Sequence, residues 1–243
     1  MATKTIPTTE VISNAESYDG IQAGIVSLKD VLKSRSYQAD PADPIMRDGL
    51  NDVRNDHWPA WAQTVLVLAL YHPEEDPRLD YWERGDTWGN RRLREISEEL
   101  RHWLRWSYHL FSSPLPYHVE KGGIFLKDAA VLSGIGIIGR NNLVIHPKWG
   151  PRIRLRAILL ENELQATGAL EGFSPCENCK VFCQKACPMD AFSPGKYSRL
   201  ICNDQMNADL KNKVPCGEIG ESGARNLVIS YCRVCEMSCP VGA

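Results

Sequence analysis

The first 175 residues of this 243-residue chain contain no cysteine, although the chain has nine in all. The chain also lacks an apolar signal segment at its start, which argues against a secreted protein held together by disulfides. No apolar run approaches the roughly 20 residues that a membrane-spanning helix needs. The formal net charge of −2 gives no general attraction to nucleic acid. These absences favour a globular protein in the reducing cytoplasm.

The cysteines form two runs, each of which ends in Cys-Pro, with two isolated cysteines between them. The runs and the isolated residues are, in order, Cys176, Cys179, Cys183 and Cys187, then Cys202 and Cys216, then Cys232, Cys235 and Cys239. In two-cluster ferredoxin segments, a tight loop supplies three thiolates to one [4Fe–4S] cluster, and the cysteine before proline binds the other cluster. Paired zinc sites also use C-x-x-C units, but they do not explain the further Cys-Pro. The sequence therefore predicts two [4Fe–4S] clusters.

The rule that the cysteine before proline binds the other cluster assigns most of the ligands. One cluster receives Cys176, Cys179, Cys183 and Cys239, and the other receives Cys187, Cys232 and Cys235. We expect Cys202 to be the eighth ligand, because it lies nearer the first run, and Cys216 to be a spare thiol. The first run is spaced two-three-three where the bacterial ferredoxin run is two-two-three. The extra residue, near Phe182, leaves open that Cys216 is recruited instead.

Apolar patterns predict a chain of mixed α and β structure. Residues 1–20 have few large apolar groups and are expected to be a loose arm. Helices are predicted over 21–33, 87–108 and 124–132, a loop over 37–44, and strands over 64–71, 142–146 and 153–160. The turn at 147–150 predicts that the last two strands form a hairpin.

Two further patterns are a row of alternating arginines and a glycine-rich stretch. Arg152, Arg154 and Arg156 alternate with apolar residues, which places three guanidinium groups on one face of a strand, either solvated or binding a phosphate or carboxylate. The stretch Gly134 to Gly139 matches G-x-G-x-x-G, but a helix precedes it and a strand follows it, the reverse of a dinucleotide site. We therefore reject a nucleotide site and expect these glycines to let backbone approach another element or a bulky ligand.

The segment from Lys127 to Leu164 resembles the stretch ahead of the clusters in epoxyqueuosine reductases and reductive dehalogenases. Both families share an A-x-x-A-G-L-G-x-x-G-[KR]-[NH] element, followed by L-I-x-P-x-x-G and a strand that leads to the ferredoxin runs. Here the element reads Ala130-Val-Leu-Ser-Gly-Ile-Gly-Ile-Ile-Gly-Arg-Asn141, and Gly150-Pro-Arg-Ile-Arg-Leu leans toward the dehalogenases. Cys202 stands where these families place the isolated fourth ligand. The resemblance covers roughly residues 60–240.

This resemblance implies an α+β fold. After a flexible N-terminal arm over 1–20, a nitroreductase-like α/β sandwich domain over 21–170 would bind base-off cobalamin. A ferredoxin-like domain with two [4Fe–4S] clusters would follow over 171–243 and receive electrons from a ferredoxin or flavodoxin. The implied cofactor contacts are Gly134, Gly136, Gly139, Arg140 and Asn141. A flavin in place of cobalamin and a non-catalytic electron carrier, docking on a redox or corrinoid partner, are the alternatives.

The resemblance also implies catalytic residues. Epoxyqueuosine reductases protonate the departing oxygen with an aspartate, and Glu120 occupies the matching position. Desolvation beside a corrin would raise the pKa of that carboxyl group toward the range of a general acid. A surface pair of Glu120 with Lys121 is the structural alternative. Dehalogenases use a tyrosine with a basic partner, for which Tyr117 and Lys121 are candidates.

The sequence departs from both families. It stops three residues beyond Pro240, whereas epoxyqueuosine reductases continue into a helical repeat region that helps to hold tRNA. No basic cluster compensates for this, so we expect a small-molecule substrate and no nucleic acid. The twin-arginine leader of respiratory dehalogenases is missing as well. The prediction is a cytoplasmic reductase.

Overall fold

The computed structural model describes residues 6–38, 58–83, 86–193, 197–219, 223, 225–229 and 231–242. Its centre is a four-stranded antiparallel sheet in the order β1-β2-β8-β5. The strands are β1 (Ile21–Ser27), β2 (Thr64–Tyr71), β8 (Ile153–Leu160) and β5 (Ser112–Pro114). Helices cover both faces of this sheet, so its central strand β2 is buried over nearly its whole length, while the other central strand, β8, carries two arginines among apolar residues. The predicted mixture of α and β structure is confirmed.

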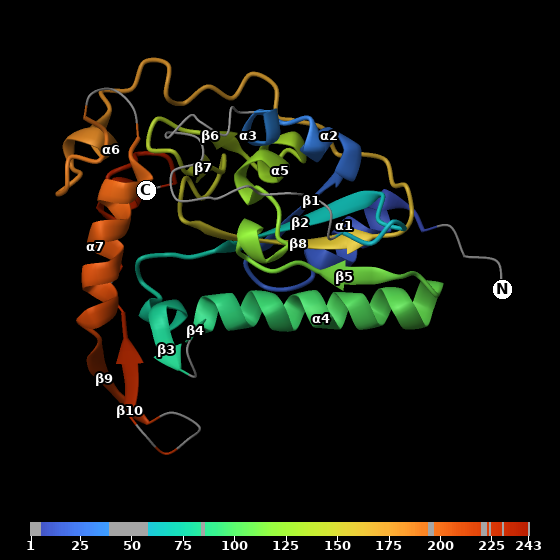
Figure 1. Cartoon of the computed structure of the whole chain (residues 1–243), viewed down its shortest axis with the longest axis horizontal. Helices are drawn as coiled ribbons and strands as arrows, with labels where there is room; N and C mark the ends of the chain where they lie inside the picture. The colour runs from blue at the N-terminus through green and yellow to red at the C-terminus, as the bar shows by residue number, and fades with distance from the viewer. Residues whose placement is uncertain are drawn as a thin grey trace.

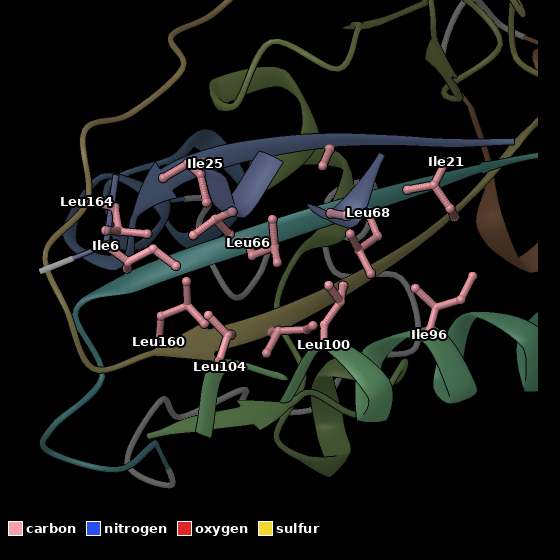
Figure 2. Packing of buried hydrophobic residues seen from close by; sticks show 14 of the residues in the cluster. Ile6, Ile21, Ile25, Leu66, Leu68, Ile96, Leu100, Leu104, Leu160 and Leu164 are labelled. Carbon is pink, nitrogen blue, oxygen red and sulfur yellow. The ribbon is translucent and has the colours of Figure 1, made fainter. Parts of the chain in front are cut away.

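One face of the sheet packs against α4 (Trp88–Tyr108) and α1 (Thr8–Ala15). In α4, apolar residues recur at helical spacing and form a stripe along one side, with charged residues on the other side. The buried apolar residues of this stripe are Leu93, Ile96, Leu100 and Leu104. The Thr87 hydroxyl caps the start of α4 by accepting from the Asn90 N–H, and His109 ends the helix in the left-handed conformation. Figure 2 shows Leu100 and Leu104 directed at Leu68 and Leu160 of the sheet.

The other face packs against α2 (Leu28–Leu32) and α5 (Leu126–Leu132). A two-stranded ribbon, β6 (Ile137–Ile138) with β7 (Val144–Ile145), follows α5. Short helices α3 (Arg35–Gln38) and η2 (Val119–Lys121) lie in the connections. This face therefore carries the glycine-rich segment and the candidate catalytic residues.

A second sheet joins the two halves of the chain in the order β4-β3-β10-β9. It combines β3 (Tyr81–Glu83) and β4 (Asp86–Thr87), which follow η1 (Pro77–Asp80), with β9 (Val214–Ile219) and β10 (Arg225–Val228). The cysteine-bearing helices are α6 (Phe182–Lys185), α7 (Arg199–Lys211) and α8 (Val234–Met237). In Figure 1, α6, α7, β9 and β10 all lie at one end of the molecule.

The long patterned elements at 64–71, 87–108, 124–132 and 153–160 are confirmed within one or two residues. Three other predictions are wrong. Residues 8–15 form a helix with buried Val11 and Ala15, where a loose arm was expected. Residues 21–27 form a strand, because pairing with β2 buries both faces of a segment whose spacing also fits a helix. The strand at 144–145 pairs with β6 and not with β8, so of the predicted hairpin the structure has only the turn, which the His146–Gly150 bridge closes.

Most of the predicted loop at 37–44 lies outside the described residues. No helix in the described part of the chain is long and apolar enough to cross a membrane. The division of residues 21–243 into two domains stays a prediction. The second sheet shows that residues from both predicted domains pair directly.

Candidate cluster and catalytic site

Four cysteine side chains from distant parts of the chain line one hollow of about 360 Å3, part of which is open solvent. We call these four the first thiol group: Cys176, Cys179, Cys183 and Cys239. Cys183 lies in α6 and Cys239 follows α8, and both are buried. Burial raises the pKa of the Cys183 thiol, and the three neighbouring thiols add to the effect. The structure thus brings together the four residues that the exchange rule assigned to one cluster.

The remaining described cysteines form a second thiol group: Cys187, Cys202, Cys232 and Cys235. Burial, together with the other three thiols and Glu236, raises the pKa of Cys235 to about 12. The backbone also positions this group, because the Cys232 N–H donates to Asp209 Oδ2 at 2.8 Å. Cys216 belongs to β9, but its side chain lies outside those that the structure describes.

The four side chains of the first thiol group surround a hollow. The first group lines its hollow together with proline, valine and isoleucine side chains. Within the described residues, no three His, Cys, Asp or Glu side chains are arranged to hold a single metal ion. Four soft sulfur donors are the ligand set that iron–sulfur clusters use. The donor chemistry of both groups therefore fits a [4Fe–4S] cluster.

The loop from Arg140 to Asn142 connects the two thiol groups. Arg140 and Asn141 line the hollow of the first group. Asn141 is 2% exposed, and its Nδ2 donates to the carbonyl of Cys235 in the second group at 3.4 Å. The carbonyl of Asn142 accepts a hydrogen bond from Lys127 Nζ. Two of the predicted cofactor contacts, Arg140 and Asn141, are therefore placed beside the candidate cluster ligands.

The three glycines of the same prediction are packed against protein. A Cβ atom on Gly136 would lie 2.4 Å from the carbonyl oxygen of Ile145, and one on Gly134 would lie 2.5 Å from that of Gly168. A Cβ on Gly139 would meet the Ile145 side chain at 2.3 Å. In the described contacts, these glycines thus let the backbone approach another protein element, which is one of the two roles that the sequence predicted.

The turn at 147–150 holds the segment that follows Cys239. Gly150 has a φ of +59°, and a Cβ there would lie 1.8 Å from the carbonyl oxygen of Val241. Arg152 Nη1 donates to the same carbonyl at 3.0 Å, and its Nη2 donates to Met237 O at 3.4 Å. Arg152, predicted to be solvated or to bind an anion, instead anchors the segment around Cys239.

A row of charges around the buried Glu236 joins α8 to the central sheet. Arg154 of β8 lies 3.3 Å from Glu236, between Nη1 and Oε2. Arg233 pairs with Glu236 and, through Nη1, lies 3.6 Å from Asp80 Oδ2. Arg233 Nη2 also donates to the carbonyl of His72 at 2.6 Å. Because Arg233 and Glu236 flank Cys235 along the chain, these contacts fix a candidate ligand relative to the sheet.

The structure gives Arg156, one of the three arginines on the predicted strand face, a neighbour that the sequence did not identify. It is 5% exposed, and its Nε has no hydrogen-bond partner among the described residues. Burial lowers its pKa from the usual value. Its guanidinium carbon lies 5.5 Å from the centre of the Tyr117 ring. Arg156 is therefore the basic neighbour of Tyr117, and only the fold reveals it.

The candidate catalytic loop is held by its backbone. The N–H groups of Lys121 and Gly123 donate to the carbonyl of His118, and Trp58 Nε1 donates to the carbonyl of Gly122 at 2.9 Å. Tyr117 and Lys121 are exposed. Glu120 lies in η2 at the centre of this loop, but its side chain is outside the described ones. Arg156, which lies near Tyr117 of this loop, and Arg154, which lies beside α8, are two positions apart in β8. They are therefore separated by about 6.6 Å along the strand.

Comparison with known proteins identifies relatives in sequence and in fold. No family model matches the chain. Over 129 residues, which are 50% of this chain and 41% of the relative, it is 30% identical to an epoxyqueuosine reductase of Leadbetterella byssophila. Its fold is similar to that of an epoxyqueuosine reductase solved with an epoxyqueuosine-modified stem loop of a tyrosine tRNA. The TM-score is 0.61 at 18% identity, over 96% of this chain and 64% of that one.

A catabolic reductive dehalogenase in complex with 3-bromo-4-hydroxybenzoic acid is also similar in fold. The TM-score is 0.56 at 13% identity, over 96% of this chain and 34% of that one. The chain thus spans less than two thirds of the length of each of these proteins. Half of the chain is similar in sequence to an epoxyqueuosine reductase, and its fold is similar to solved structures of epoxyqueuosine reductases and of a reductive dehalogenase, as its motifs predict.

Proposed function

We propose that this chain is an iron–sulfur reductase that passes electrons through two [4Fe–4S] clusters to a cobalamin. Its relatives support a reductase role. The observation that carries the finer proposal is the convergence of eight cysteines into two groups of four, each built from both cysteine runs. In each group, the cysteine before proline comes from the other run, as in a two-cluster ferredoxin segment.

The proposed ligands are the members of the two thiol groups. Burial raises the pKa values of Cys183 and Cys235, so these thiols hold their protons and iron would bind with the release of those protons. The clusters would supply one-electron transfers, with an external ferredoxin or flavodoxin as donor. The chain's own contribution is to hold the two groups side by side through the Arg140–Asn142 loop.

For the proton that a reductive cleavage consumes, we propose Glu120 or Tyr117 as donor. Glu120 matches the position of the catalytic acid in the epoxyqueuosine reductases. Tyr117 matches the dehalogenase pattern of a tyrosine with a basic partner, and the Arg156 cation 5.5 Å from its ring would stabilise the phenolate left after donation. Replacing each acid separately distinguishes them: Glu120→Gln or Tyr117→Phe should abolish turnover while both clusters stay in place, and unchanged turnover would remove that residue from the mechanism.

The substrate proposal needs a correction. The sequence argued against nucleic acid, but a relative of the same fold was solved with a tRNA stem loop. We therefore propose two substrate classes to be tested side by side: an epoxyqueuosine-modified stem loop and a halogenated phenolic acid of the kind bound by the dehalogenase neighbour. Turnover of one in the presence of cobalamin and a low-potential reductant would decide between them.

The central experiment is anaerobic purification followed by metal analysis and spectroscopy. Two clusters predict about eight iron atoms per chain and no zinc. A spectral change on adding base-off cobalamin supports the cofactor proposal, and the absence of any change would remove it. A bound yellow chromophore would favour the flavin alternative, and intact clusters without any organic cofactor would favour a simple electron carrier.

The ligand assignment has its own test, based on serine replacements. Cys216→Ser should retain about eight iron atoms, whereas Cys202→Ser should retain about four. The reverse result would exchange the roles of Cys202 and Cys216.

A further inference from the structure

Lys127 is a cation that the proposed reaction does not yet use. It extends from α5 toward the second thiol group, where Nζ donates to the Asn142 carbonyl and lies 6.0 Å from the centre of the Tyr197 ring. Burial is the main reason that its pKa falls to about 8, while the nearby Cys202 and Cys235 thiols act in the opposite direction. Its ammonium group is therefore close enough to interact with two candidate cluster ligands.

Tyr197 connects Lys127 to the same thiol group. The Cys202 side chain is a hydrogen-bonding neighbour of its hydroxyl, and its ring lies against Phe192, with centroids 5.5 Å apart. A tyrosine hydroxyl keeps its proton at neutral pH, so it is available as a hydrogen-bond donor. Tyr197 thus presents a fixed hydrogen-bond donor to one candidate ligand while its ring lies beside the Lys127 ammonium group.

The surrounding charges do not neutralise Lys127 directly. No ion pair of Lys127 is found among the described residues, and the adjacent Asp128 carboxylate accepts two hydrogen bonds from Ser36. Arg199 adds a second positive charge near Lys127. Asp209 and Glu236 contribute negative charge on the Cys232 and Cys235 side, but Glu236 is paired with Arg154 and Arg233.

The first thiol group has a different environment. Two cations lie near it: Arg140 lines its hollow, and Arg152 affects Cys239 while its guanidinium donates to two backbone carbonyls. Among the described residues, no tyrosine hydroxyl is found bonded to a thiol of this group. The two candidate clusters would therefore meet unequal electrostatic surroundings.

We propose that Lys127 and Tyr197 raise the reduction potential of the cluster held by the second thiol group. Reduction adds one electron and one negative charge to a cluster, and no bond forms or breaks. A cation in a poorly screened site and a hydrogen bond to a ligand sulfur both favour the more negative state. An electron taken from a low-potential donor would then settle on the second cluster before the first. This inference rests on the proposed function.

The test is a redox titration followed by electron paramagnetic resonance on the anaerobic holoprotein, with dithionite as the reductant. Lys127→Met removes the charge and keeps the length of the side chain, and we expect the midpoint of the second cluster to fall by at least 59 mV, a tenfold change in its reduction equilibrium. Lys127→Arg should keep the midpoint within half of that shift. Tyr197→Phe should lower the same midpoint by deleting the hydrogen bond. The first midpoint should move less in each variant.

The matched control is Lys185→Met in α6. Lys185 is exposed and stands two residues before Cys187, so water and salt screen its charge, and its loss should leave both midpoints in place. Full iron content with an unmoved second midpoint in Lys127→Met overturns the inference. If Lys127→Met does not load iron, Tyr197→Phe decides in the same way. A wild-type protein that binds no iron would instead refute the proposed function itself.

Discussion

The central sheet and the cysteine-bearing segment are stabilised in different ways. Both hydrophobic clusters of the described structure consist of residues up to Leu164, and many of their members are fully buried. Beyond that point, α7 runs for 13 residues without one buried side chain. The buried apolar residues described after position 175 are few: Cys183, Ala191, Phe192, Ile229 and Cys239. A segment with so little apolar burial needs another source of stability, and metal ligation supplies it in many small domains.

The largest expected effect is the loss of structure in the cysteine-bearing segment, but not in the central sheet, when iron is removed. Removing iron from the anaerobic protein with a chelator should leave the central sheet folded and expose the segment after residue 165 to proteolysis. The physical reason is that binding energy at the thiol groups is folding energy for this segment. Limited proteolysis with mass spectrometry of the surviving fragment checks this. Equal resistance before and after iron removal would contradict the comparison.

A pair of leucine truncations measures the difference in apolar burial. Leu100 is fully buried in α4, so Leu100→Ala should lower the free energy of unfolding by about 2–5 kcal/mol. Leu200 is 58% exposed in α7, and Leu200→Ala should change it by less than about 0.5 kcal/mol. Urea denaturation followed by circular dichroism gives both values. Similar costs for the two variants would show that α7 belongs to a core.

A pair of glycine replacements tests the contact between the two regions. Gly150→Ala combines a left-handed φ of +59° with a Cβ placed 1.8 Å from Val241 O. Gly172→Ala has a similar φ of +70°, but nothing lies within 4 Å of the new Cβ. We expect Gly172→Ala to cost about 1–2 kcal/mol from the backbone alone and Gly150→Ala to cost more. Iron content should fall in Gly150→Ala only, and equal behaviour would show that the turn does not support Cys239.

The smallest effect is a pH dependence at the same turn. Burial lowers the pKa of His146 to about 4, and its unprotonated Nδ1 accepts from the N–H groups of Lys148 and Trp149. The unfolded chain therefore binds more protons below pH 6.5, so this stabilisation is complete above pH 6.5 and is lost as the pH falls toward 4. His146→Asn keeps an acceptor without titrating. Its unfolding free energy should vary less between pH 7 and 5 than that of the wild type, and parallel curves would contradict this role.

The sequence predicted best where one signal dominated. The run at 64–71 is too short and too uniformly apolar for a surface helix, and the stripe of α4 extends over five turns. The grouping of the cysteines followed from the rule that the last cysteine of each run crosses over. The segment 21–27 was misread because Ile21, Ile25 and Leu28 fit helical spacing, and only its pairing with β2 selects a strand.

Other parts of the site depend on tertiary contacts that have no local signal. Alternation along β8 placed Arg152, Arg154 and Arg156 on one side, but it gave no information on what faces them. Two of the three anchor α8 and the segment after Cys239, and the third lies against Tyr117. Lys127 stood within the family-like element without a role, because its proximity to Cys202 and Cys235 arises only when α5 and α7 come together.

The crossover of the thiol groups sets an order of events during synthesis of the chain. The four strands of the central sheet are complete once Leu160 has been made, so this sheet can fold while translation continues. Neither thiol group is complete until the ribosome has passed residues 232–239, because each takes a member from that run. Iron delivery to this protein would therefore act on a chain whose scaffold is already built. A cell short of iron would accumulate molecules in which the central sheet is folded and the cysteine-bearing segment is not.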